Sequence, residues 1–148
     1  MEEKDILIHL FKIKDLAFDT IESYFNGMNY FCTYKEDGYY LYTIPSPKFG
    51  PYGIRVSNAS IIYCSYTVIG AIDLLDFKEY AIVNYGFVNI PIDENNSLIL
   101  DNEEDRLSIR SLNLGGLNKV FITLVKRELP FGFIPNVTVE MHPPRALK

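Results

Sequence analysis

The sequence predicts an α+β domain in which an N-terminal helix packs on a mainly antiparallel β-sheet. The first observation behind this prediction is a helical spacing of apolar residues within residues 4–26. The second is a series of apolar runs separated by the residues that favour turns. The third is residues 60–69, an uncharged run rich in isoleucine, valine, tyrosine and threonine. Because 148 residues can bury a core of their own, we expect residues 1–148 to form one globular domain.

Residues 60–69 are predicted to be the central strand of this sheet. β-branched and aromatic residues favour strands, and an uncharged run of this length fits a strand that is covered on both faces. Ser57 and Asn58 precede the run and Gly70 follows it, which marks its two ends. Five of its side chains are expected in or beside the core, namely Ile61, Ile62, Tyr63, Cys64 and Val68.

Residues 4–26 are predicted to be one helix that ends at Gly27, where a left-handed residue would stop it. Its apolar residues are spaced by three and four along one stripe, which consists of Ile6, Leu10, Ile13, Ala17, Ile21 and Tyr24. An alternative divides the segment into a strand over residues 6–11 and a helix with Asp15 as its N-cap. The sequence leaves open whether residues 4–13 are helix or strand.

A β-hairpin is predicted next, with strands over residues 30–34 and 39–44. Asp37-Gly38 lies between them and is a strong signal for a two-residue turn. Residues 45–53 contain three prolines and two glycines, so we expect a loop there rather than a strand.

The second half of the chain is predicted to contain one short helix and several strands. The helix covers residues 71–78 and should bury Leu74 and Phe77. Strands are expected over residues 80–90, 98–100, 107–114, 119–126 and 136–141. Residues 142–148 include two prolines and are expected to form a frayed tail.

Aromatic residues are distributed unevenly along the chain. All 11 tyrosines lie between Tyr24 and Tyr85, and tryptophan is absent. Sheet packing explains this enrichment, because tyrosine is favoured on half-buried strands. The alternative is an aromatic groove for a ligand, and the loop that carries Phe49 and Tyr52 is then a weaker candidate binding site.

Charge and hydropathy disfavour several classes of protein. A net charge of −5 argues against a nucleic-acid-binding protein, which normally presents a basic patch. No run reaches the roughly 20 apolar residues of a membrane-spanning helix, and no signal peptide is recognisable. We therefore expect a soluble cytoplasmic protein with no direct nucleic-acid partner and no membrane partner.

Side chains suited to catalysis are few. His9 and His142 have no neighbouring carboxylate or nucleophile in the sequence, and phosphate-binding and nucleotide-binding motifs are absent. Cys32 and Cys64 lack the spacing of metal ligands and are expected to be reduced thiols, although the sequence leaves a disulfide between them open. We therefore predict a protein that is not an enzyme, with no catalytic residue, no cofactor and no metal.

Six acidic residues and no basic residue lie between positions 93 and 105. The acidic residues are Asp93, Glu94, Asp101, Glu103, Glu104 and Asp105. Part of the segment has the ligand spacing of a calcium-binding EF-hand loop, but Leu98 stands where that loop requires glycine. We expect all six carboxylates to be exposed and to form the binding site for a basic protein partner.

The leading hypothesis is therefore a non-enzymatic protein-binding module, an inhibitor or immunity protein that covers a basic partner such as a toxin or nuclease. Toxin-neutralising immunity proteins, as a broad class, are often small, acidic and without catalytic motifs. One alternative is a viral or phage-type structural or assembly protein, and a homo-oligomer is compatible with the sequence. The other is a small-molecule binder or an enzyme with a tyrosine-lined pocket that forms only in three dimensions.

Overall fold

One antiparallel sheet with helices on one of its faces makes up the described part of the chain. The computed structural model describes residues 3–46, 48–69, 72–90, 97–114 and 116–126. The strands there are β1 (Phe31–Glu36), β2 (Tyr39–Thr43), β3 (Tyr52–Ser57), β4 (Ser60–Val68), β5 (Val88–Ile90), β6 (Ser97–Asp101), β7 (Asp105–Leu114) and β8 (Leu117–Lys126). The helices are α1 (Glu3–Lys14), the short 3₁₀ helix η1 (Phe18–Thr20), α2 (Ile21–Gly27) and α3 (Leu74–Tyr85). The predicted α+β class is confirmed.

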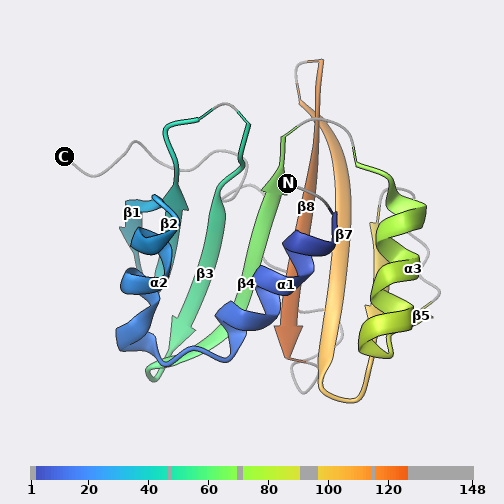
Figure 1. Cartoon of the computed structure of the whole chain (residues 1–148), viewed down its shortest axis with the longest axis horizontal. Coiled ribbons are helices and arrows are strands. Elements are labelled where there is room, and N and C mark those ends of the chain that lie inside the picture. Colours follow the sequence, from blue (N-terminus) through green and yellow to red (C-terminus); the bar gives the residue numbers. More distant parts are fainter. Residues whose placement is uncertain (1–2, 47, 70–71, 91–96, 115, 127–148) are drawn as a thin grey trace.

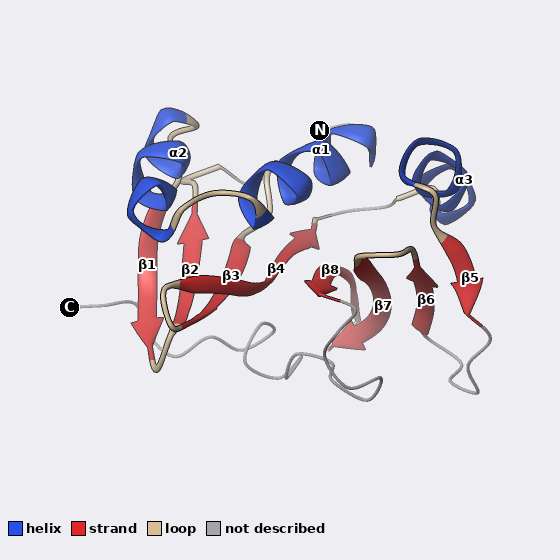
Figure 2. Ribbon diagram, turned by 90° about the horizontal axis from the view of Figure 1, so that it is seen from below, coloured by secondary structure: helices blue, strands red, loops and turns tan. Residues whose placement is uncertain are grey.

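Two four-stranded meanders build the sheet and meet at β4 and β8. The strand order is β1-β2-β3-β4-β8-β7-β6-β5, so each meander pairs its strands in chain order. The two meeting strands are antiparallel and pair from Tyr63 and Val125 to Val68 and Val120. Figure 1 shows this pairing in the middle of the sheet, and Figure 2 shows α1, α2 and α3 on the same face. None of the described helices is long and apolar enough to cross a membrane.

β4 is the central strand that the sequence predicts. Its side chains Ile61, Tyr63, Cys64 and Val68 are buried. Between Tyr63 and Ile61 the pairing with β3 shifts by one residue, so Ile62 forms a β-bulge and is only half-buried. The prediction that these five residues lie in or beside the core is confirmed.

The N-terminal segment contains two α-helices rather than the single predicted one. α1 ends at Lys14, the backbone of Ala17 is extended, and η1 then leads into α2. A continuous helix over residues 4–26 would be roughly 35 Å long and would run in one direction. The break lets α1 pack on β4 and β8 while α2 packs on β1 (Figure 2).

Two further predictions about this segment are wrong. α2 ends at Gly27 as predicted, but Gly27 is not left-handed, and the left-handed residue that follows is Asn29, with φ of 65°. Residues 6–11 belong to α1, so the alternative strand is not formed. Their apolar side chains recur at helical spacing, and Ile6, Leu7 and Leu10 are all buried against the sheet.

Tyrosines fill much of the core between the helices and the first meander. The Tyr52 ring is fully buried, and its centroid lies 5.4 Å from that of Phe25, 5.2 Å from Tyr30 and 4.7 Å from Tyr66. The Tyr30 hydroxyl donates a hydrogen bond to the Gly50 carbonyl (2.9 Å), and the Gly50 N–H donates one to the Tyr66 hydroxyl (2.9 Å). The tyrosine enrichment of these residues therefore reflects core packing.

α3 is longer than predicted and displaces most of a predicted strand. It continues to Tyr85, so the strand expected over residues 80–90 is reduced to β5. The carboxylate of Asp73 caps its start by accepting hydrogen bonds from the N–H groups of Leu75 and Asp76, both at 3.1 Å. Gly86, with φ of 69°, ends it as a left-handed C-cap.

The remaining predictions for the second half have mixed outcomes. The strands expected over residues 98–100, 107–114 and 119–126 are present as β6, β7 and β8. Phe77 is buried as predicted, but Leu74 is 38% exposed rather than turned inward. The strand and tail expected over residues 136–141 and 142–148 lie outside the described residues.

A pair of core substitutions tests this packing. Leu10 is fully buried against the sheet, so Leu10→Ala should lower the free energy of unfolding by about 2–5 kcal/mol. Ile62→Ala should lower it by less, because half-buried Ile62 loses less apolar contact. Urea denaturation of both variants measures the two losses, and a larger loss for Ile62→Ala would contradict the placement of α1 over β4.

Candidate functional site

The predicted acidic residues divide into exposed and buried groups. Glu103 and Glu104 are exposed in the turn between β6 and β7, whereas Asp101 and Asp105 are buried at 5% and 3% exposure. Asp93 and Glu94 lie outside the described residues. The prediction of exposed carboxylates is therefore wrong for Asp101 and Asp105. We call residues 102–105, which include this turn, the acidic corner.

Asp101 is buried because an arginine on the adjacent strand neutralises it. Nε of Arg106 donates a hydrogen bond to Oδ1 of Asp101 (2.8 Å), and the terminal guanidinium nitrogen Nη2 donates to Oδ2 (3.1 Å). The two residues are register partners across β6 and β7, and both are buried. Such a two-point contact satisfies a buried carboxylate. Arg106 follows directly after residues 93–105, the segment with six acids and no base. Because the segment itself offers no cation, its sequence predicted that Asp101 would be exposed.

Asp105 is buried against the last residue of α1. Its Oδ2 accepts a hydrogen bond from the Lys14 ammonium, which also lies 3.9 Å from Oε2 of Glu104. Burial raises the pKa of the Asp105 carboxyl above its usual range, while Lys14 acts in the opposite direction. This contact joins the end of α1 to the start of β7.

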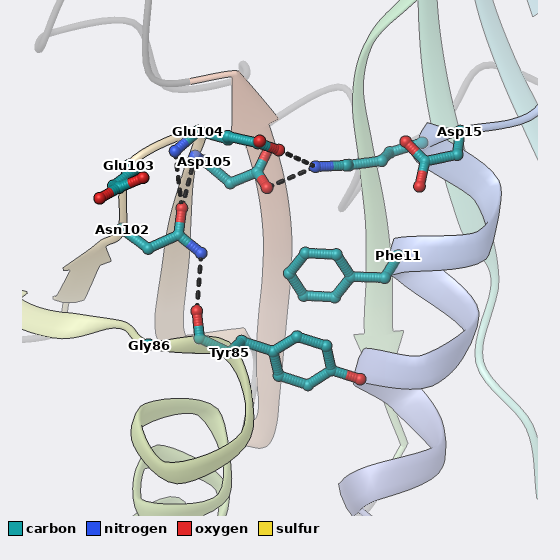
Figure 3. Close-up of a pocket in the computed structure, with 9 residues that line it drawn as sticks. Phe11, Asp15, Tyr85, Gly86, Asn102, Glu103, Glu104 and Asp105 are labelled. Atoms are coloured by element: carbon teal, nitrogen blue, oxygen red, sulfur yellow. Dashed lines mark hydrogen bonds and ion pairs between the residues drawn. The ribbon is translucent and has the colours of Figure 1, made fainter.

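Asn102 fixes the shape of the acidic corner (Figure 3). Its side-chain oxygen accepts hydrogen bonds from the N–H groups of Glu104 (3.0 Å) and Asp105 (2.7 Å). Its side-chain nitrogen donates to the carbonyl of Tyr85 at the end of α3 (2.9 Å). The corner is therefore attached to the end of α3.

A cleft lies between the acidic corner and the ends of two helices. One hollow of about 480 Å³ is lined by Phe11, Lys14, Asp15, Tyr85, Gly86, Asn102, Glu103, Glu104 and Asp105. A second hollow of about 600 Å³ shares Lys14, Asp15 and the three acidic corner residues and adds Lys126. We call these two hollows together the acidic cleft, since four carboxylates and two lysines line it.

An aromatic pair forms one wall of the acidic cleft. The rings of Phe11 and Tyr85 stack with centroids 4.2 Å apart and an angle of 1° between their planes. The Lys14 ammonium lies 5.2 Å from the centre of the Phe11 ring, a cation–π contact. The Lys14 ammonium shows that this aromatic wall can accommodate a cation.

The helix ends add to the negative potential of the acidic cleft. α1 ends at Lys14 and α3 ends at Tyr85, and both residues line the cleft. The carboxyl end of a helix carries a partial negative charge of about half an elementary charge. Carboxylates and helix ends together therefore favour a positively charged group at this position.

The described residues of the weaker candidate loop lie apart from the acidic cleft. Tyr52 is the first residue of β3 and is fully buried, so the prediction that it belongs to a binding loop is wrong. Phe49 is half-buried and packs against the main core. Neither residue lines the acidic cleft, where Tyr85 is the tyrosine present.

His9 and the two cysteines are engaged in contacts within the protein, and His142 lies outside the described residues. Nδ1 of His9 lies 2.7 Å from the Tyr24 hydroxyl, and burial, with Lys12 nearby, lowers the pKa of His9. Both thiols are free, and Cys64 donates a hydrogen bond to the carbonyl of Leu10 (3.4 Å). Burial raises the pKa of the Cys64 thiol, which disfavours the reactive thiolate. Within the described residues, no group of three or more His, Cys, Asp or Glu side chains is placed to hold a metal ion.

The functional interpretation comes from the residues of the acidic cleft themselves. Comparisons with protein-family models, with curated proteins and with solved structures found no match to this chain. The sequence identified Glu103 and Glu104 but gave no signal for Phe11, Asp15 or Tyr85. Phe11 and Asp15 lie at the end of α1, far from Tyr85 in the chain, and the packing of α1 beside α3 brings them together (Figure 3).

The Lys14–Asp105 contact predicts a pH-dependent loss of stability. Lys14→Met should lower the free energy of unfolding by about 1–3 kcal/mol near neutral pH, because it leaves a buried carboxylate without its cation. An acid whose folded pKa is raised costs stability in full above that pKa, and the cost shrinks as the pH falls from the folded toward the unfolded pKa. The difference between wild type and variant should therefore shrink in the acidic range.

Urea denaturation at about pH 7 and about pH 4 measures this difference. Lys12→Met is the matched control, because Lys12 is exposed on the same helix and its loss should change stability by about 0.5 kcal/mol or less. An equal loss for Lys14→Met at both pH values would show that Lys14 acts through packing rather than through charge.

Proposed function

We propose that this chain is a non-enzymatic protein-binding module that docks on a basic partner through the acidic cleft. The observation that carries the proposal is the position of exposed Glu103 and Glu104 beside the stacked Phe11 and Tyr85 rings. Carboxylates attract a guanidinium or ammonium group, and an aromatic wall offers it an apolar and π-rich contact. The expected ligand is thus a basic side chain on a protein surface.

Preorganisation of the acidic corner supports this proposal. Asn102 holds the backbone of Glu104 and Asp105 and binds the end of α3, so little conformational freedom would be lost on docking. The buried ion pairs leave Glu103 and Glu104 as the solvent-facing charges of the corner. Exposed charges of one sign mainly accelerate association with an oppositely charged partner.

The biological role that fits best is inhibition of a basic protein, such as a toxin or nuclease, in the cytoplasm. The net charge of −5 matches a partner that itself binds a polyanion. An inhibitor of this kind acts by covering the partner's basic surface, which requires no catalytic residue. The proposed partner-binding residues are Glu103 and Glu104, with Asp93 and Glu94 retained as a sequence-based hypothesis.

Charge reversal at the corner tests the proposed docking. Glu103→Lys with Glu104→Lys should weaken binding of a fluorescent hexa-arginine peptide roughly tenfold at low salt, mainly through slower association. Wild-type binding should also weaken as salt rises, because the Debye length is only about 8 Å at physiological ionic strength. Fluorescence anisotropy gives the affinity, and stopped-flow mixing gives the association rate.

The matched control is Asp19→Lys with Glu22→Lys, which makes the same change in net charge on η1 and α2. This variant should bind the peptide nearly as well as wild type. Both double variants should then be used as baits in a pull-down from the native host. A protein partner retained by wild type and by the control, but lost by the corner variant, supports the proposal. Equal losses for both variants would show that only overall charge matters, and would overturn it.

A further inference from the structure

The outer side of α3 is apolar where a surface helix is normally polar. Phe77 and Ala81 bury its inner side, yet Leu75 is 77% exposed and Val83 is 72% exposed on the outer side. Ile82 is also 39% exposed. Figure 1 places α3 at the β5 end of the sheet. Several exposed apolar side chains on one helix indicate an interaction surface.

The order of residues along this surface is regular. Leu75 and Ile82 are seven residues apart, so at about 100° per residue they point in nearly the same direction, two turns apart. Along the helix axis, Lys78 and Glu79 lie midway between Leu75 and Ile82. Around the axis, they point about 50° to either side of the direction in which Leu75 and Ile82 point. The surface therefore has an apolar residue at each of two helical turns, Leu75 and Ile82, and a positive and a negative side chain on either side between them.

We propose that this surface binds the same surface of a second copy of the chain, with the two α3 helices parallel about a two-fold axis. In that arrangement Leu75 meets Leu75 and Ile82 meets Ile82 across the axis. Lys78 of each copy lies opposite Glu79 of the second copy, because a parallel two-fold axis brings opposite flanks of the helices together. The two copies thus form two pairs of opposite charge.

The antiparallel alternative lacks this complementarity. A two-fold axis across the helices brings identical flanks together, so Lys78 would face Lys78 and Glu79 would face Glu79. Like charges in direct opposition are destabilising. The surface is therefore complementary to the same surface of a second copy, and it is so in the parallel arrangement.

The expected dimer is weak and depends on protein concentration. A single pair of 12-residue helices buries less area than the roughly 1,200 Å² of a stable interface. The helix axes would lie about 8–10 Å apart. Tyr85 and Gly86 end α3 and line the acidic cleft, so a parallel dimer presents both clefts at the same end.

Sedimentation equilibrium of the full chain at several concentrations tests the dimer and its charges. Wild type should show a reversible monomer–dimer equilibrium. Glu79→Lys and Lys78→Glu should each raise the dissociation constant roughly tenfold, because each replaces two opposite-charge pairs by two like-charge pairs. The exchanged double variant, with Lys78→Glu and Glu79→Lys, should return close to wild type. Glu22→Lys is the control for net charge, and circular dichroism checks that each variant is folded.

The orientation is tested with single cysteines under mild oxidation. Leu75→Cys should form a disulfide-linked dimer, since residue 75 faces its own copy only in the parallel arrangement. Wild type under the same oxidant controls for half-buried Cys32 and buried Cys64. A monomer at all concentrations, a dimer indifferent to the single charge changes, or cross-linking only when Leu75→Cys is mixed with Ile82→Cys would each overturn the proposal.

Discussion

Pairing between β4 and β8 is the constraint on which the rest of the molecule depends. All other strand pairs lie within one meander, so this pair joins the two halves of the sheet. It also provides the surface on which α1 packs. With α1 over the junction and α3 over the second meander, the carboxyl ends of both helices reach the same region as the turn between β6 and β7. The acidic cleft therefore exists only when the two meanders are joined.

Burial divides the carboxylates of the acidic segment into two kinds. Asp101 and Asp105 have lost most of their contact with water, and each is compensated by a cation from a neighbouring element. Removing one partner of such a pair is more costly than the pair itself is stabilising. Glu103 and Glu104 remain in water, where their charge has little effect on stability and is available to attract a ligand. One short segment thus supplies both structural and solvent-facing charge.

Local sequence patterns predicted correctly the elements whose structure depends on their own residues rather than on distant contacts. The hairpin around Asp37-Gly38 and the uncharged run at residues 60–69 are of this kind. Predictions failed where a distant contact decided the outcome. The break after Lys14 lets α1 and α2 pack on different strands, and the burial of Asp105 depends on a lysine 91 positions earlier in the chain. The aromatic wall of Phe11 and Tyr85 could not be predicted, because no local pattern links a helix residue near the start to one that ends α3.

The meander topology also has a consequence for synthesis of the chain. When Val68 leaves the ribosome, β1 to β4 can already pair with one another, but one edge of β4 has no strand beside it. That edge consists of buried, uncharged residues, and it stays open until the chain has been made as far as Lys126. An open apolar edge is a template for pairing with other chains. The nascent protein therefore passes through a defined interval, between these two residues, in which aggregation competes with folding and a chaperone has a strand edge to protect.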